Sequence, residues 1–187
     1  VSPFAQDIVA NDLIVQTDGK ILVGGTMRRW IGDGVAELDM FAGQFNTNGS
    51  LDATFGAGGI YTFPTGTITA LQREEARAIA IMPNGKIQLA GTHLLRLDAN
   101  GTLDTTFSST PVASVVTATD MKPQTDGKFV ISGTSGGNFV VARYNGGPTL
   151  DTTFGGGSIS VDFGATERAQ AVLIDPNGDI VVGGSSI

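Results

Sequence analysis

The chain repeats itself, and this internal repetition constrains its fold more than any other feature. A motif of two apolar runs joined by an Asp-Gly or Asn-Gly turn occurs four times: LIVQTDGKILVGG (13–25), AIAIMPNGKIQLAG (78–91), MKPQTDGKFVISG (121–133) and AVLIDPNGDIVVGG (171–184). A second motif, Leu-Asp-x-Thr-Phe, follows the first three copies, within GSLDATFGAGG (49–59), GTLDTTFSST (101–110) and PTLDTTFGGG (148–157). Two alternating motifs predict a repeat protein in which each copy is one structural unit.

The first motif predicts a β-hairpin. A glycine follows Asp or Asn in each turn, at the position where glycine accepts the positive φ that other residues avoid. The apolar runs beside the turn, such as Ile180–Val182, are nearly continuous, which is typical of strands covered on both faces. We therefore expect positive φ at all four turn glycines, which are Gly19, Gly85, Gly127 and Gly178.

The spacing of the repeats defines the unit. The turn glycines lie 66, 42 and 51 residues apart, enough for a hairpin and two further strands. We expect an all-β fold, with antiparallel four-stranded blades in a β-propeller or propeller-like repeat array. The chain would be a single domain of about three and a half blades. The expected divisions are 1–5 (last strand of a preceding blade), 7–63, 64–116 and 117–163 (three blades), and 164–187 (first half of a fourth).

The Leu-Asp-x-Thr-Phe motif predicts a tight turn held between apolar anchors. Its Asp and Thr side chains can accept hydrogen bonds from nearby backbone N–H groups. We expect the Leu (for example Leu103) and above all the Phe to be anchors, with each Phe packed between its blade and a neighbour. The turn acids are Asp52, Asp104 and Asp151, and the core anchors are Phe55, Phe107 and Phe154.

Calcium binding is the alternative interpretation of these acids. The segment 98–101 (Asp-Ala-Asn-Gly), with Asp104, resembles an acidic metal loop, since Ca²⁺ prefers carboxylate and carbonyl oxygens. The matching stretches 46–49 and 144–147 contain no acidic residue. We therefore favour turn chemistry and expect neither a metal nor another cofactor.

Composition excludes several partners. The formal net charge is −7, and the 11 Lys and Arg residues are scattered, which does not suit a nucleic-acid surface. No apolar run approaches the roughly 18 residues of a membrane-spanning helix. The absence of cysteine rules out disulfides and leaves the compartment open. Because the sequence starts at Val1, we expect a processed product or part of a longer protein.

Two insertions interrupt the repeat, at 26–37 and 65–77. Both fall in connections that an antiparallel blade places opposite its hairpin turns, so we expect them to share one face. Insertions gathered on one face often form the binding side of a repeat array. A loop that folds onto its own blade and buries Trp30 is an equal alternative, and the second cluster suits solvated ion pairs. The candidate binding residues are Arg28, Arg29, Trp30, Asp33, Arg73, Glu74, Glu75 and Arg77.

Catalytic motifs are missing from the sequence. His93 is the single histidine, so neither a multi-histidine metal site nor a second candidate for a triad is available. The run Gly155–Gly157 follows a Leu-Asp-x-Thr-Phe turn and does not open a helix, so it is not a dinucleotide-binding loop. Paired acids at glycosidase spacing are left open. We expect no enzymatic activity.

The repeat resembles the delta-sixty β-propeller family. The shared signature is a D/N-G-K-I-x-V-x-G hairpin followed by G-x-L-D-x-T-F-G, and it covers nearly the whole chain. The resemblance implies a part of a large secreted or cell-surface bacterial protein, or of a phage tail fibre, and it implies no catalytic residues. Departures are Asp179 at the Lys position of the fourth hairpin, Ser108 after the second Phe, and the two insertions.

Two functions of different class follow from these expectations. One is a structural module of an extracellular, cell-surface, filament or virion-fibre assembly, in which blades stack on further repeats or on other copies. The other is an adhesin-like or lectin-like domain that binds glycan or protein through the insertion face. Exposed strand edges recruit partners, and this favours the structural role. We also expect that the chain does not form a closed ring by itself.

Overall fold

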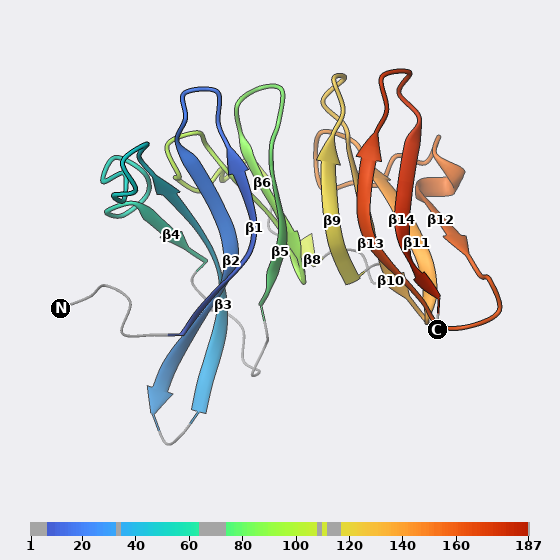
Figure 1. Ribbon diagram of the computed structural model, residues 1–187, viewed down its shortest axis with the longest axis horizontal. Coiled ribbons are helices and arrows are strands. Elements are labelled where there is room, and N and C mark those ends of the chain that lie inside the picture. The colour runs from blue at the N-terminus through green and yellow to red at the C-terminus, as the bar shows by residue number, and fades with distance from the viewer. Residues whose placement is uncertain (1–6, 33–34, 64–73, 108–109, 112–116, 187) are drawn as a thin grey trace.

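The computed structural model describes residues 7–32, 35–63, 74–107, 110–111 and 117–186. For residues 29–32, 35–37 and 110–111 only the backbone is described. The chain is all-β and forms four antiparallel sheets that stand side by side in chain order (Figure 1). The described residues contain no helix of the length and apolarity needed to cross a membrane.

Three sheets have four strands, and the fourth has two within the described residues. The first sheet contains β1 (Ile8–Val15), β2 (Ile21–Gly32), β3 (Val35–Phe45) and β4 (Ile60–Thr62). The second contains β5 (Ala76–Ile81), β6 (Ile87–Gly91), β7 (His93–Leu97) and β8 (Thr110–Pro111). The third contains β9 (Thr117–Pro123), β10 (Phe129–Ser135), β11 (Asn138–Tyr144) and β12 (Ser158–Val161), preceded by the 3-10 turn η1 (Gly155–Gly157). The fourth contains β13 (Glu167–Ile174) and β14 (Ile180–Ser186).

These sheets are the blades of the repeat. The first sheet lies within 7–63, the second within 64–116, the third within 117–163, and β13 and β14 within 164–187. Each blade is a simple meander in which consecutive strands pair. The segment 1–5 lies outside the described residues.

Each hairpin turn has the conformation that its sequence demands. Gly19, Gly85, Gly127 and Gly178 have φ of 82°, 78°, 86° and 90°. In the second blade the Gly85 N–H donates to the Met82 carbonyl at 2.8 Å, and the Asn84 side chain accepts from the Lys86 N–H at 3.1 Å. The Asx residue therefore fixes the turn, and the glycine supplies the left-handed φ that closes it.

The cores lie between the blades, because inner strands such as β6 and β10 are buried along most of their length, on both faces. Leu22, Met40 and Phe55 of the first blade pack with Leu89 and Leu95 of the second. The second and third blades form another core, in which the main side chains are Leu94, Phe107, Met121, Phe129 and Tyr144. Side-by-side stacking of sheets across such cores is the packing of propeller blades.

The first strand of every blade carries a β-bulge at the same repeat position. A bulge leaves a backbone N–H outside the sheet ladder. In the first blade Asp12 Oδ1 accepts from the Leu13 N–H at 2.8 Å, and its Oδ2 accepts from the Ile79 N–H of the second blade at 2.9 Å. Asp120 does the same for Met121 of its own blade, at 2.7 Å, and for Val172 of the fourth, at 2.9 Å.

We call Asp12 and Asp120 the clamps. They join the first blade to the second and the third to the fourth. At the equivalent position the second and fourth blades have Ala78 and Ala171, so the clamp alternates along the chain. The junction between the second and third blades instead has its large apolar core and a hydrogen bond from Arg96 Nη1 to the Gly146 carbonyl at 2.7 Å.

Candidate functional site

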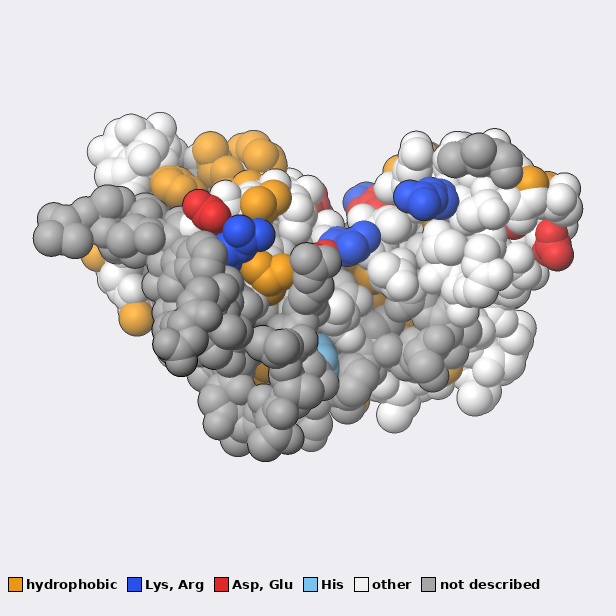
Figure 2. All heavy atoms as spheres, turned by 90° about the horizontal axis from the view of Figure 1, so that it is seen from below, with side chains coloured by type: hydrophobic (Ala, Val, Ile, Leu, Met, Phe, Trp, Pro, Cys, Tyr) orange, Lys and Arg blue, Asp and Glu red, His pale blue; other side chains and the backbone are white. Residues whose placement is uncertain are grey.

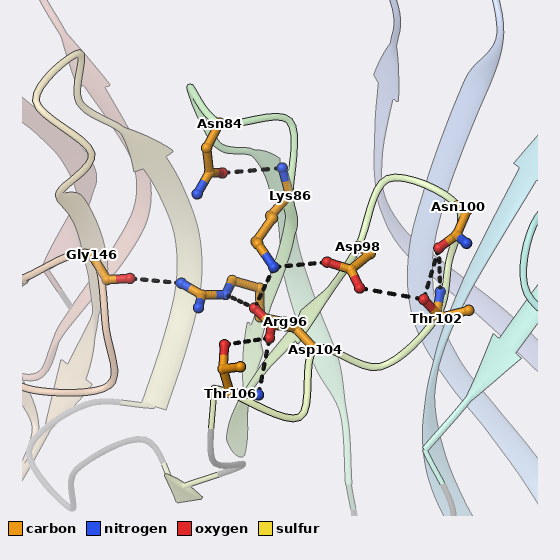
Figure 3. Close-up of polar contacts among 9 residues, drawn as sticks. All are labelled: Asn84, Lys86, Arg96, Asp98, Asn100, Thr102, Asp104, Thr106 and Gly146. Carbon is orange, nitrogen blue, oxygen red and sulfur yellow. Dashed lines mark hydrogen bonds and ion pairs between the residues drawn. The ribbon is translucent and has the colours of Figure 1, made fainter.

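The densest cluster of charged side chains surrounds the Asp of each Leu-Asp-x-Thr-Phe turn. In the second blade this is Asp104, whose side chain is only 3% exposed (Figure 3). Its Oδ1 accepts from the N–H and the hydroxyl of Thr106, at 3.0 and 2.6 Å. Its Oδ2 accepts from Lys86 Nζ at 2.8 Å and from Arg96 Nε at 2.7 Å. One carboxylate thus joins the hairpin turn, the third strand and the following turn, and we call this arrangement the hub.

The hub recurs in the other two four-stranded blades. In the third blade Asp151 accepts from Lys128 Nζ and Arg143 Nε, each at 2.8 Å, and from the Thr153 hydroxyl at 2.7 Å. In the first blade Asp52 accepts from Lys20 Nζ at 2.7 Å and from the Thr54 hydroxyl at 2.6 Å. Gln44 occupies the first-blade position equivalent to Arg96. The hub is therefore part of the blade and is common to all three.

These contacts hold the hub in its charged form. The hydrogen bond from Lys20, with two from Thr54, lowers the pKa of Asp52 from 3.8 to about 2. Lys86 and Thr106 lower the pKa of Asp104 well below its ordinary range, and Lys128 and Thr153 do so for Asp151. The same bonds raise the pKa of the Lys20 and Lys86 ammonium groups.

The structure has a lysine side chain at the position where the calcium interpretation would require a metal ion. Lys86 Nζ lies 2.7 Å from Asp98 Oδ1 and 2.8 Å from Asp104 Oδ2, so the protein itself supplies the positive charge between the two acids. Asn100 Oδ1 accepts from the N–H and hydroxyl of Thr102. In the part of the chain that the structure describes, no three His, Asp or Glu side chains are grouped as metal ligands. The geometry favours turn chemistry.

The expected apolar anchors differ in their burial. Phe55 and Phe107 are 1% and 2% exposed and lie in the two inter-blade cores. Phe154 is only half-buried, because it faces the two-stranded fourth blade, and Arg143 stacks on its ring at 4.7 Å. Leu103, the other expected apolar anchor, is 37% exposed. Leu103 lies in the turn that follows β7, where it forms an isolated antiparallel β-bridge with Leu97.

The first insertion, 26–37, is not a loop. It extends β2 and β3 into a long hairpin that points away from the β1–β2 turn (Figure 1). The two strands pair as far as Gly32 and Val35. Arg28 is exposed and forms an ion pair with Asp7 at 3.5 Å. The side chains of Arg29, Trp30 and Asp33 lie outside the described residues.

The second insertion, 65–77, is described only from Glu74 onward, so Arg73 lies outside the description. Glu74 is fully buried, which argues against its predicted role as an exposed binding residue. Glu167 has the same repeat position and is equally buried, where its carboxylate accepts from the Phe163 and Ala165 N–H groups. Arg77 belongs to β5 and pairs with Glu75 at 2.7 Å, the solvated pair that the sequence suggested.

The structure does bring residues of the two insertions together. Arg28 and Glu75 line one groove of about 490 Å³ between the first two blades, on the side away from the hairpin turns. A neighbouring groove of about 600 Å³ contains two arginines among hydroxyl and amide side chains: Arg77, Thr117, Thr119, Thr134, Thr166, Arg168 and Gln170. Figure 2, which views this side, shows basic side chains along the hollow between two lobes of the molecule.

His93 is not placed at an open catalytic site. It lies on β7, where its side chain is 12% exposed, and burial lowers its pKa. Its Nδ1 is 3.8 Å from the buried Glu74 carboxylate, and its ring stacks with Phe63 at a centroid distance of 6.5 Å. These contacts anchor β7 inside the blade.

Antiparallel four-stranded blades, cores between them and a repeated hub define an all-β protein of β-propeller type. Residues 83–107 and 124–154 match the family described as a domain of unknown function (DUF5122) beta-propeller. No curated protein matches the chain. The two matched segments run from the hairpin turn to the Phe of the next motif, so each contains one hub Lys and one hub Asp.

The hub lysines are the functional residues that sequence reasoning missed. In the sequence, Lys20, Lys86 and Lys128 stand out only as parts of the hairpin-turn signature. The available signal was their co-occurrence: each Lys is followed by a Leu-Asp-x-Thr-Phe motif, whereas the fourth hairpin has Asp179. An acid at that position is not compatible with the same ion pair.

Proposed function

We propose that the chain is a non-enzymatic structural module of an extracellular, cell-surface, filament or virion-fibre assembly. The observation that carries this proposal is how its charged groups are used. The three acids whose pKa is lowered, Asp52, Asp104 and Asp151, each accept from a lysine and a threonine of their own blade. Charge that an enzyme would direct into a cleft here holds turns together.

The resemblance to delta-sixty repeats supports the proposed location. Turn-rich all-β blades with little charge, 16% of residues, suit a repetitive scaffold whose partners are further blades. Immunogold labelling of source cells or particles with antibodies against the chain tests this role. Label on the outer surface, on filaments or on fibres is expected. Label confined to the cell interior would contradict it.

The second candidate is recognition of a glycan or protein, and the grooves opposite the hairpin turns favour it. Arg77 and Arg168, beside several threonine hydroxyls, offer donors suited to an acidic sugar or a carboxylate-bearing peptide. A glycan array is the test, with the double variant R77A/R168A beside the wild type. Binding that the double variant loses would establish recognition. The control is L103D, at a leucine of the turn that follows β7, which is not among the residues that line the groove.

A further inference from the structure

The large apolar side chains at the two ends of the blade array are exposed, although their repeat counterparts are buried. On β1, Leu13 is 59% exposed, whereas Ile79, Met121 and Val172 at the same repeat position are 3%, 1% and 2% exposed. On β14, Val181 is 48% exposed. Its counterparts Leu22, Gln88 and Val130 are fully buried. The ends therefore present faces that elsewhere are covered by a neighbouring blade.

The outer face of the first blade is also shaped like a blade junction. Its apolar side chains line a hollow of about 340 Å³ with no polar wall: Ile8, Ala10, Val23, Phe41, Phe45 and Ile60. In the third blade the counterparts of four of these pack on the second blade, and they are Ala118, Ile131, Val140 and Tyr144. A contiguous apolar face of this kind is an interaction surface.

The outer face of the fourth blade is the other half of such a junction. Leu173 on β13 is 51% exposed beside Val181. Their counterparts in the second blade, Ala80 and Gln88, are buried, and Ala80 lies in the core shared with the third blade. The exposed face of the fourth blade therefore corresponds to the face of the second blade that packs on the third.

The alternation of the clamps identifies which blade fits. The first and third blades have Asp at the clamp position, and the second and fourth have Ala. A junction from a fourth blade to a first blade would therefore be of the same type as the internal junction from the second to the third. At such a junction the Leu13 N–H does not need an acceptor from the preceding blade, because Asp12 of its own blade already accepts from it. The Met121 N–H is held in the same way by Asp120 at the junction from the second to the third blade.

We propose that two copies of the chain bind head to tail, with the outer face of the fourth blade of one copy on the outer face of the first blade of the other. The contact is heterologous, so each copy has one face of each kind. This inference rests on the proposed structural role and names its partner, which is a second copy. The contact surface on one side is built around Leu13 and Val15, and on the other around Leu173 and Val181.

Sedimentation velocity of the wild type and two variants tests the proposal. The wild type is expected to form dimers or longer oligomers at micromolar concentration. A charge in either face, L13D or L173D, should weaken association at least about tenfold, because it places an unpaired carboxylate in an apolar contact. Mixing the two variants should restore a one-to-one dimer, because each still has the face that the other needs.

The matched control is L103D, the same change at an exposed leucine on the rim, and it should associate like the wild type. Circular dichroism establishes that all variants are folded, which is expected because these side chains are exposed within one copy. A wild type that stays monomeric would overturn the proposal, as would a mixture of variants that stays monomeric. Neither result would bear on the proposed surface location, because the labelling experiment tests that location separately.

Discussion

The junction between the second and third blades differs from the two junctions that flank it. It is joined by a large apolar core that contains Phe107, whereas the flanking junctions add a carboxylate clamp, Asp12 or Asp120, to their packing. The hub around Asp104 is common to both kinds, because it lies within a blade. The difference shows that the hub at the turns stabilises each single blade. The residue at the clamp position of the first strand, Asp or Ala, determines how two neighbouring blades are joined.

The largest effect should come from the clamp-free junction. Phe107→Ala removes a ring that is 2% exposed from the core between the second and third blades, and it should cost roughly 3–5 kcal/mol of the free energy of unfolding. Urea unfolding measures it. Phe154→Ala is the control, because this ring is half-buried and should cost clearly less. Equal losses would mean that the junction is not what stabilises these anchors.

The second-largest loss of stability is expected from a change in the hub. Asp104→Ala leaves the Lys86 and Arg96 charges and the Thr106 N–H without their acceptor, at a cost of about 1–3 kcal/mol. Thermal unfolding measures the loss. Thr105→Ala, at the variable position of the same motif, is the control and should change little. If Asp104→Ala were as stable as the control, the hub would not contribute to the stability of the blade.

The hub also predicts the response to acid. A carboxyl whose pKa is lowered on folding stabilises the folded state above its ordinary pKa, and that contribution is lost as the pH falls towards the folded-state value. For Asp52 this window runs from 3.8 down to about 2. The melting temperature of the wild type should fall steeply through this range. Asp104→Ala should show a shallower fall, since one contributor is gone.

The clamp is expected to matter less than the hub. Asp12→Ala leaves the Leu13 and Ile79 N–H groups without their acceptor at the first junction, and it should cost about 1–2 kcal/mol. Hydrogen exchange locates the effect, because the Ile79 amide should lose protection while that of Met121, at the clamp-free junction, keeps it. Equal loss at both amides would contradict the distinction between junctions.

The turn glycine gives the smallest measurable loss. Gly85→Ala forces a side chain into a φ of 78°, although nothing lies within 4 Å of the added carbon, so the cost is backbone strain of about 1 kcal/mol. Chemical denaturation measures it, and Gly85→Asn should cost less because Asn tolerates this region. An alanine variant of unchanged stability would show that the turn adapts.

Chelation should have no effect at all. The hub acids are held by lysine and threonine, so EDTA should leave the melting temperature unchanged. A fall of many degrees that Ca²⁺ restores would mean that the segment 98–104 binds a metal.

The sequence was a good guide to the blades because hairpin turns and strands are encoded locally. Turn glycines and apolar runs sufficed to predict antiparallel all-β blades. It was a poor guide to the hub, because Lys20 and Asp52 are 32 residues apart and meet only when the blade forms. The insertion at 26–37 was expected to lie in a connection between strands, whereas it continues the pairing of β2 with β3, which depends on the opposite strand. The burial of Glu74, whose N–H donates to the Leu38 carbonyl of the first blade at 3.0 Å, depends on a contact between segments far apart in the sequence.

Cross-linking tests most directly the proposed assembly of this chain through the outer faces of its first and fourth blades. The sequence contains no cysteine, so L13C and L173C each introduce one thiol at one face. A short bis-maleimide added to an equimolar mixture should give a covalent dimer that contains one copy of each variant. L103C in place of either should give only background. A mixture that yields no mixed dimer above that background would contradict the claim.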